Sequence, residues 1–249
     1  MMVYPVVLEQ SINSSDFNGI PQACEEGVYL CVDTAAVDPL KCHDFFDVRH
    51  LVTVSDLFNS RVHLGHRVGV RDPHMVPFLF GTRLGMDIID LEQSVGLLGD
   101  ALNFLAHVAF RGGVVLFVSR HVQTIPLVER TAVECGEYAY CSLWRSGTFT
   151  NSLSKFGAVT RLPDLVVFVS TLNNIFETHE AVTETAKLNI PSIGIVDSSC
   201  DPRLITYPVP GNDDTPCSIE LYCRLFKETI LRAKAKAKEL QSSSSEPTN

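Results

Sequence analysis

The sequence predicts an α/β fold in which a parallel sheet is covered by helices on both faces. Short, continuously apolar segments, such as residues 114–119, 164–170 and 192–197, alternate with segments of helical periodicity. A strand that is apolar on both sides is buried on both faces, which is typical of parallel sheets. The chain has 249 residues, of which 45% are apolar, a size and composition that suit one large α/β domain or two small ones.

The first half of the pattern contains two expected helices and two expected strands. Apolar residues from Leu91 onward recur at intervals of four and three, which places them on one helix face. These residues are Leu91, Val95, Leu98, Leu102, Leu105 and Ala109. Asp90 and Gln93 resemble a capping box, and Gly112-Gly113 ends the helix. We then expect a strand over 114–119, a helix over about 124–134 and a strand over 138–142.

The second half continues the alternation. We expect a strand over 164–170, a helix from Asn173 or Asn174 to Leu188, and strands over 192–197 and 207–210. Thr215 followed by Pro216 is typical of an N-cap with proline at the first helical position, so a last helix begins there. Two connections, residues 143–163 and 198–214, are long and predict no convincing helix. Long loops at the carboxyl ends of parallel strands are usually functional.

The ends of the chain differ from its centre. Residues 1–50 have little periodicity and are interpreted as an extended acidic arm, residues 51–240 as the α/β domain, and residues 241–249 as a disordered, Ser-rich tail. The first Lys or Arg is residue 41, so no basic targeting presequence is visible. No apolar run approaches the roughly 20 residues of a membrane span. The eight cysteines include no Cys-x-x-Cys and suit free thiols in a reducing compartment.

The net charge of −9 is unevenly distributed. The first 60 residues hold nine acids and two bases, whereas the remainder is nearly neutral. Two basic segments lie in that remainder, over residues 61–85 and 224–238. The overall negative charge argues against nucleic acid as a partner, but the positive charge of these two segments is compatible with nucleic-acid binding.

Several kinds of chemistry lack a matching pattern. There is no G-x-G-x-x-G and no phosphate-binding G-x-x-x-x-G-K-[ST], so no nucleotide cofactor is predicted. His63, His66 and His74 lack cysteine partners at zinc-site spacing, so no metal is predicted. Asp213 and Asp214 could be paired catalytic carboxylates, but they are more simply charges at the start of the last helix. With no G-x-S-x-G elbow, no catalytic residues are predicted.

Nucleic-acid binding has more support. The 61–85 segment places four Arg and three His among glycines, which allow close approach of a backbone to phosphates. The 143–161 loop adds an indole, a guanidinium, hydroxyls and an amide that can stack on bases or reach sugars and phosphates. The RNA-binding candidates are His63, His66, Arg67, Arg71, His74, Arg83, Trp144, Arg145, Thr148, Thr150, Asn151, Lys155 and Arg161.

Four motifs, taken together, make a family resemblance. They are H-L-G-H-R-V-G-V-R-D-P-H-M-V-P-F-L-F-G-T-R-L-G-M-D-I-I-D-L at 63–91, W-R-S-G-T-F-T-N at 144–151, R-L-P-D at 161–164, and N-I-P-S-I-G-I-V-D-S-S-C-D-P-R-L-I-T-Y-P-V-P-G-N-D-D at 189–214. In this order and spacing the chain resembles the small-subunit ribosomal protein S2 family over roughly residues 51–232. The resemblance implies a flavodoxin-like, three-layer α/β/α fold with a five-stranded parallel sheet. It also implies that Pro210–Asp214 shape the turn into the last helix and that Asp164 is a structural cap.

The chain departs from the bacterial pattern, and its short central loop together with the retained P-G-N-D-D at 210–214 resembles the mitochondrial branch. Bacterial members insert a long helical hairpin between the T-N and R-L-P-D motifs, whereas nine residues, 152–160, separate them here. Ser146-Gly147 stands where Gly-Gly is common, and the acidic arm has no clear bacterial counterpart.

The leading hypothesis is therefore a non-catalytic structural constituent of the mitochondrial small ribosomal subunit. It would contact small-subunit ribosomal RNA and neighbouring ribosomal proteins, partly through the acidic arm. It would involve no cofactor, membrane, small-molecule substrate or homo-oligomer. One alternative is a Rossmann-like, small-molecule-binding enzyme without the usual glycine fingerprint. Another is a protein-interaction module whose main binding element is the arm.

Overall fold

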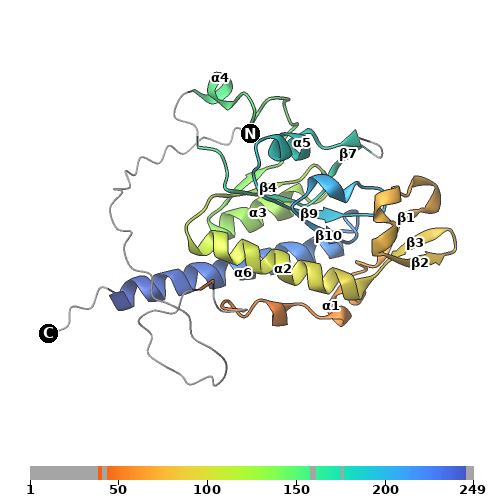
Figure 1. Cartoon of the computed structure of the whole chain (residues 1–249), viewed down its shortest axis with the longest axis horizontal. Coiled ribbons are helices and arrows are strands. Elements are labelled where there is room, and N and C mark those ends of the chain that lie inside the picture. The colour runs from red at the N-terminus through yellow and green to blue at the C-terminus, as the bar shows by residue number, and fades with distance from the viewer. Residues whose placement is uncertain (1–38, 41–43, 158–160, 175–176, 245–249) are drawn as a thin grey trace, which may run out of the picture.

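A computed structural model describes residues 39–40, 44–157, 161–174 and 177–244 (Figure 1). Its centre is a five-stranded, all-parallel sheet in the order β10-β9-β6-β4-β5. The strands are β4 (Val115–Val118), β5 (Tyr138–Tyr140), β6 (Leu165–Phe168), β9 (Ser192–Val196) and β10 (Tyr207–Pro210). Counted along the chain, this is the flavodoxin order 2-1-3-4-5. The predicted sheet is confirmed.

Helices cover both faces of the sheet, which confirms the three-layer architecture. Helices α2 (Leu91–Phe110), α3 (Ile125–Cys135) and α6 (Pro216–Ser244) pack on one face, and α5 (Glu180–Lys187) packs on the other. Successive side chains of β6 alternate between the two layers. Val167 joins the cluster under α2 and α6, whereas Val166 and Phe168 join the cluster with α5.

A small antiparallel sheet lies at one end of the molecule, on the right in Figure 1. Its strands are β1 (Leu64–Arg67), β2 (Leu79–Arg83) and β3 (Met86–Ile89), in the order β1-β3-β2. The short helix α1 (Val54–Asn59) precedes it, with Thr53 as a hydroxyl N-cap. Four 3-10 helices complete this region and the connections, at Arg49–Leu51, Val68–Val70, Pro73–Phe78 and Pro202–Leu204.

Two connections differ from the sequence-based expectation. The segment predicted to start a helix at residue 173 or 174 instead forms the antiparallel pair β7 (Leu172–Asn174) and β8 (Glu177–Thr178). Helix α5 starts only after His179, whose ring accepts a hydrogen bond from the backbone N–H of Ala181. The loop expected over 143–163 contains a short helix, α4 (Ser152–Phe156).

The domain begins earlier than the boundary expected at residue 51. Phe46, Val48 and Val52 are buried in the main core, so the segment from residue 44 is part of the domain. Most of the predicted acidic arm lies outside the described residues. Helix α6 continues to Ser244, into the segment predicted to be a disordered tail, and residues 245–249 are not described. Among the helices described, none combines the length and apolar character needed to cross a membrane.

Candidate nucleic-acid interface

The loop after β5 is organised by one buried carboxylate. Glu184, on α5, is 4% exposed and accepts hydrogen bonds from four donors of the loop. Its Oε1 accepts from the backbone N–H of Gly147 at 2.6 Å and from the indole Nε1–H of Trp144 at 3.3 Å. Its Oε2 accepts from the backbone N–H groups of Phe149 at 2.8 Å and Thr150 at 3.4 Å. The carboxylate therefore fixes both the backbone curve and the indole of the W-R-S-G-T-F-T-N motif.

The hydrogen bonds also decide the protonation of Glu184. Burial alone would raise the pKa of this carboxyl, but the donors from Phe149, Gly147, Trp144 and Thr150 together outweigh burial and lower the pKa. The loop therefore requires the ionised form. Gly147 adopts a left-handed φ of 81°, which glycine tolerates without strain, at the point where its N–H turns toward Glu184.

The anchored loop presents a polar outer surface. Arg145, Thr150, Asn151 and Lys155 are exposed. The ammonium of Lys155 donates to the backbone carbonyl oxygens of Arg145 at 3.2 Å and Ser146 at 2.5 Å, which closes the loop. Guanidinium, hydroxyl, amide and ammonium groups thus lie together on one short segment, and these groups suit sugar and phosphate contacts.

Two residues predicted to contact RNA from this loop are buried instead. Trp144 is 6% exposed and packs edge-on against Tyr140, Phe149 and His179. Thr148 is 7% exposed and donates its hydroxyl hydrogen to the carbonyl oxygen of Arg145. Both side chains pack the loop in this structure, and their contact with RNA stays a prediction.

Arg161 is exposed beyond this loop and is paired. Its guanidinium lies 2.7 Å from the carboxylate of Asp164. Asp164 also accepts a hydrogen bond at 2.8 Å from the backbone N–H of Val114, at the start of β4. This confirms the expectation that Asp164 is a structural cap.

The 61–85 segment likewise divides into inward and outward side chains. Arg71 forms an ion pair with the fully buried Asp87 of β3. The imidazole of His66 lies between Asp197 and Asp214, 3.1 and 3.2 Å away. The hydrogen bond with Asp197 is the largest cause that raises the pKa of His66 to about 9. Acidic groups of the fold hold both side chains, and the contact of Arg71 and His66 with RNA stays a prediction.

Four candidates of this segment remain accessible. Arg67 and Arg83 are exposed, and neither makes an ion pair within the part of the chain that the structure describes. His74 is exposed and contacts the carboxylate of Asp72 at 2.9 Å. His63 is half-buried and stacks on Phe58, with ring centroids 4.6 Å apart, and burial lowers its pKa.

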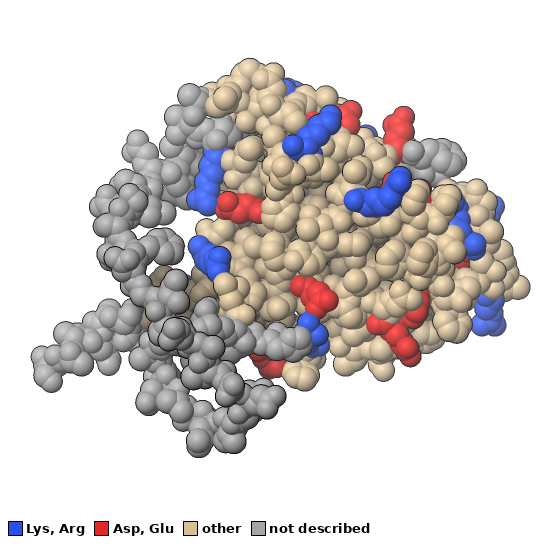
Figure 2. All heavy atoms as spheres, viewed as in Figure 1, with Lys and Arg blue, Asp and Glu red and all other residues tan. Residues whose placement is uncertain are grey.

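The structure does not bring the two candidate groups together. Figure 1 places the β1-β3-β2 sheet at the right-hand end of the molecule and α4 at the top, away from that sheet. On the face shown in Figure 2, basic and acidic side chains are interspersed and form no continuous patch of one sign. The accessible candidates therefore form two separate small surfaces.

Most basic side chains in the last helix that were predicted to form a basic segment are paired with other groups of the chain. Lys227 pairs with Glu134 at 2.5 Å, and Lys234 pairs with Glu137 at 2.5 Å. Arg232 pairs with Glu228, and Lys236 donates to the carbonyl oxygen of Phe45. The expectation of RNA contact through this segment is therefore weakened by internal pairing.

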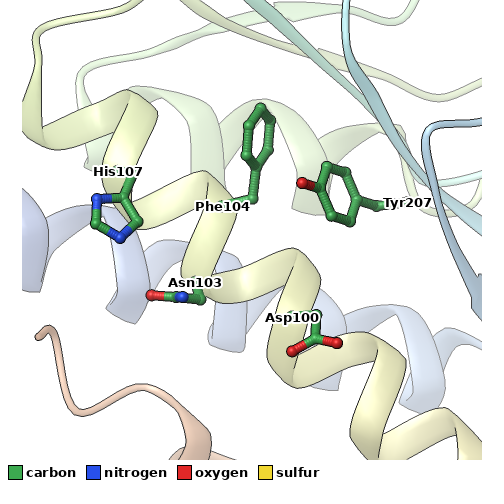
Figure 3. Close-up of a pocket in the computed structure, with 5 residues that line it drawn as sticks. All are labelled: Asp100, Asn103, Phe104, His107 and Tyr207. Carbon is green, nitrogen blue, oxygen red and sulfur yellow. The ribbon is translucent and has the colours of Figure 1, made fainter. Parts of the chain in front are cut away.

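A surface pocket lies between α2 and β10. It is lined by Asp100, Asn103, Phe104, His107 and Tyr207 (Figure 3). Its aromatic wall is the stacked pair of Phe104 and Tyr207, with centroids 4.7 Å apart, and Asp100 pairs with Arg49 at 2.6 Å. In the described part of the chain, no serine hydroxyl is hydrogen-bonded to a histidine ring, as a nucleophile and its base would be.

Sequence reasoning missed Glu184 altogether. It lies in a helix of ordinary composition, 34 to 40 residues after the donors that it binds. A single acid on an amphipathic helix carries no signal of its own. Only the burial of its position beside the loop distinguishes it.

Comparison with known families gives one match. The model of the family "Ribosomal protein S2" matches residues 57–159 and 152–233. The two matched segments meet at residues 152–159. This is where the bacterial insertion was expected to be missing.

Curated relatives of the chain carry names of the same family. The chain is 55% identical over 204 residues to "Small ribosomal subunit protein uS2m" of Bos taurus, which covers 82% of this chain and 70% of the bovine protein. It is 30% identical over 225 residues to "Small ribosomal subunit protein uS2" of Rickettsia akari, covering 73% of this chain and 75% of that protein. The corresponding protein of Ehrlichia chaffeensis is 30% identical over 219 residues, with 73% and 76% covered. Both bacterial alignments are longer than the part of this chain that they cover, so those proteins carry residues with no counterpart here.

Proposed function

The chain belongs to the ribosomal protein S2 family, and from this membership we propose its role. It is a structural constituent of the mitochondrial small ribosomal subunit. The mitochondrial assignment rests on the 55% identity to the bovine protein uS2m, against 30% to the bacterial proteins. The enzyme alternative finds no support in these relatives, all of which are named as ribosomal proteins.

The Glu184-anchored loop is the proposed primary RNA contact. The observation that supports it is a buried carboxylate that satisfies four donors and holds Arg145, Thr150 and Asn151 outward on a rigid curve. Preorganised backbone reduces the entropy lost on binding. Arg145 supplies the phosphate-matching guanidinium, and Thr150 and Asn151 supply groups for sugar and phosphate oxygens.

The exposed face of the β1-β3-β2 sheet is the proposed second contact. Arg67 and Arg83 lie on strands of this sheet and have no acidic partner in the described residues. His63, His74, Lys155 and Arg161 are secondary candidates, because each is already engaged by a neighbouring group. Trp144, Thr148, Arg71 and His66 are proposed to position the contact residues.

The acidic arm is proposed to bind a neighbouring protein rather than RNA. Most of the chain's net negative charge lies in the first 60 residues, and phosphate would repel it. The role is proposed to be structural throughout, without a catalytic step or a bound cofactor.

The RNA assignment is tested with paired charge reversals. Arg67→Glu with Arg83→Glu is expected to reduce incorporation of the tagged chain into the small subunit, with a deficit relative to wild type that is largest at low salt and shrinks as salt is raised. Two lost phosphate contacts reduce the slope of log affinity against log salt by about 1.5–2. The matched control is Arg111→Glu with Arg130→Glu, two exposed arginines on the opposite end of α2 and on α3.

Equal incorporation of both double variants at every salt concentration would refute RNA contact through the small sheet. It would leave the ribosomal role intact, because wild-type incorporation is measured in the same gradients.

A further inference from the structure

The pocket between α2 and β10 is built by one face of a helix and the last strand of the central sheet. Asp100, Asn103, Phe104 and His107 lie three or four residues apart along α2, so they share one face of that helix. Tyr207 belongs to β10, an edge strand of the sheet, and lies beside Phe104 (Figure 3). The pocket has a volume of about 370 Å³, which falls in the range of about 300–1,000 Å³ that is typical of ligand sites.

Three polar groups of this pocket are not used by the fold. The side-chain amide of Asn103, the ring of His107 and the hydroxyl of Tyr207 make no hydrogen bond within the described residues. Oδ1 of Asn103 is buried as well, and buried acceptors are rarely left unpaired. Without an internal partner, this amide is free to turn either of its polar atoms toward the pocket. The three groups therefore offer donors and acceptors at one place, as a binding site does.

The apolar wall of the pocket is held by ring packing. Phe104 stacks on Tyr207, with ring centroids 4.7 Å apart, and Phe46 packs edge-on against His107 at 5.0 Å. Phe104 and Tyr207 are only half-buried, so part of their surface is open to a ligand. A fixed aromatic wall beside unpaired polar groups can recognise an apolar side chain together with the peptide groups next to it.

The charges around the pocket favour a neutral ligand over a nucleic acid. Arg49 is paired with Asp100 at 2.6 Å, so its positive charge is already matched. Burial, and to a smaller extent Arg111, lowers the pKa of His107, so this ring is neutral at neutral pH. None of the described residues that line the pocket is a Lys or Arg. A phosphate group would therefore find no free cation here.

The edge strand beside the pocket is unsuited to strand addition. Two of the four residues of β10, Pro208 and Pro210, have no backbone N–H to donate to an added strand. A peptide at this edge must be held by side chains of α2 and by Tyr207 instead of by a continuous ladder of backbone hydrogen bonds.

We propose that this pocket docks an extended, uncharged segment of a neighbouring protein. One aliphatic or aromatic side chain of the segment packs on Phe104 and Tyr207, and the peptide groups beside it hydrogen-bond with Asn103 and His107. The pocket shares no residue with either proposed RNA contact. The inference rests on the proposed function to the extent that the neighbour belongs to the small ribosomal subunit.

The first test probes Phe104 and Tyr207 with hydroxyl radicals, in the purified free chain and in small subunits isolated through the tagged full-length chain. We expect oxidation of both rings in the free chain and oxidation about tenfold slower in the subunit, because the centre of an interface excludes water. Rings that are oxidised equally in both samples would overturn the proposal. Ultraviolet cross-linking of Phe104 or Tyr207 to RNA in the same particles would overturn it too, because the occupant would then be nucleic acid.

The second test blocks the pocket with Asn103→Arg. The matched control is Ala235→Arg, which adds the same side chain at an exposed position of α6. Both chains are expected to enter the small subunit. Subunits with Asn103→Arg are expected to contain about tenfold less of one neighbouring protein by quantitative mass spectrometry and to regain oxidation of Phe104 and Tyr207. A full protein complement with protected rings in Asn103→Arg would contradict the docking role.

Thermal unfolding of the free chains separates a blocked pocket from a damaged fold. If Asn103→Arg unfolds at a lower temperature than Ala235→Arg, Asn103→Ala replaces it, because this variant removes the amide without adding bulk. The same loss of the neighbouring protein is then expected, and an unchanged complement overturns the proposal. Absence of the wild-type chain from the small-subunit fractions is a different result, since it refutes the proposed ribosomal role and with it this class of partner.

Discussion

Glu184→Gln is the substitution that most directly probes how the loop is held. The change keeps the size of the side chain but replaces one carboxylate oxygen by an NH₂ group. Each oxygen of Glu184 now accepts from two loop donors, Gly147 and Trp144 on one and Phe149 and Thr150 on the other. Whichever oxygen is replaced, two N–H groups then face another donor.

The cost follows from the burial of those donors. A buried donor left without an acceptor costs about 1–3 kcal/mol, so two of them cost about 2–6 kcal/mol. Glu180→Gln is the matched control, because Glu180 lies on the same helix and is exposed. Its effect is expected to stay within about 0.5 kcal/mol.

The readout is intrinsic fluorescence during denaturant unfolding. The chain has a single tryptophan, so emission reports on Trp144 alone. Glu184→Gln is expected to lower the unfolding midpoint and shift native emission to the red, since the loop that packs the indole loses two of its four hydrogen bonds. A variant with wild-type midpoint and emission would refute the claim that Glu184 holds the loop.

The difference in unfolding free energy between wild type and Glu184→Gln changes with pH in a defined direction. Because the folded-state pKa of Glu184 is lowered, its ionised form stabilises the fold above the ordinary pKa of 4.5. That stabilisation is lost as the pH falls through the folded-state value. The difference in unfolding free energy between wild type and Glu184→Gln should therefore be constant near neutrality and shrink in acid. A difference that grows on acidification would contradict the assignment.

Two further predictions concern the packing around the site. A Cβ at Gly211 would lie 1.9 Å from the hydroxyl oxygen of Tyr222. Gly211→Ala should therefore lower the free energy of unfolding by about 1–3 kcal/mol in denaturant titrations. Adding Tyr222→Phe removes that oxygen and should recover part of the loss. No recovery would mean that the hydroxyl is not the obstacle. Arg71→Gln leaves the fully buried carboxylate of Asp87 without its cation. It should therefore lower the unfolding midpoint far more than Arg67→Gln, which removes an exposed guanidinium. Equal midpoints would show that the ion pair contributes nothing to the fold.

The central sheet was predictable because its strands are apolar on both faces and bounded by clear helix signals. Asp90 does cap α2, accepting from the backbone N–H of Glu92, and Gln93 donates back to Asp90. Asn212 in the P-G-N-D-D turn accepts from the backbone N–H groups of Asp214 and Thr215, as expected of a turn into α6. Such signals are local, so the sequence contains them.

The sequence-based expectations differ from the structure where contacts between distant elements determine the local structure. The sequence predicts that a helix starts in the segment of β7 and β8, whereas α5 starts several residues later, after its N-cap residue His179. The burial of Trp144 depends on Glu184, 40 residues away, and the contacts of His66 depend on Asp197 and Asp214. A list of polar residues on two loops could not tell which side chains turn inward, because their partners lie on distant elements.

The central claim is that this chain is a structural part of the mitochondrial small ribosomal subunit. The direct measurement is the sedimentation of the tagged full-length protein in a gradient of mitochondrial lysate. We expect it in the small-subunit fractions and in whole ribosomes, and depletion of the protein should reduce those particles. Recovery of the protein only as a free species at the top of the gradient, with small subunits unaffected by its depletion, would contradict the account.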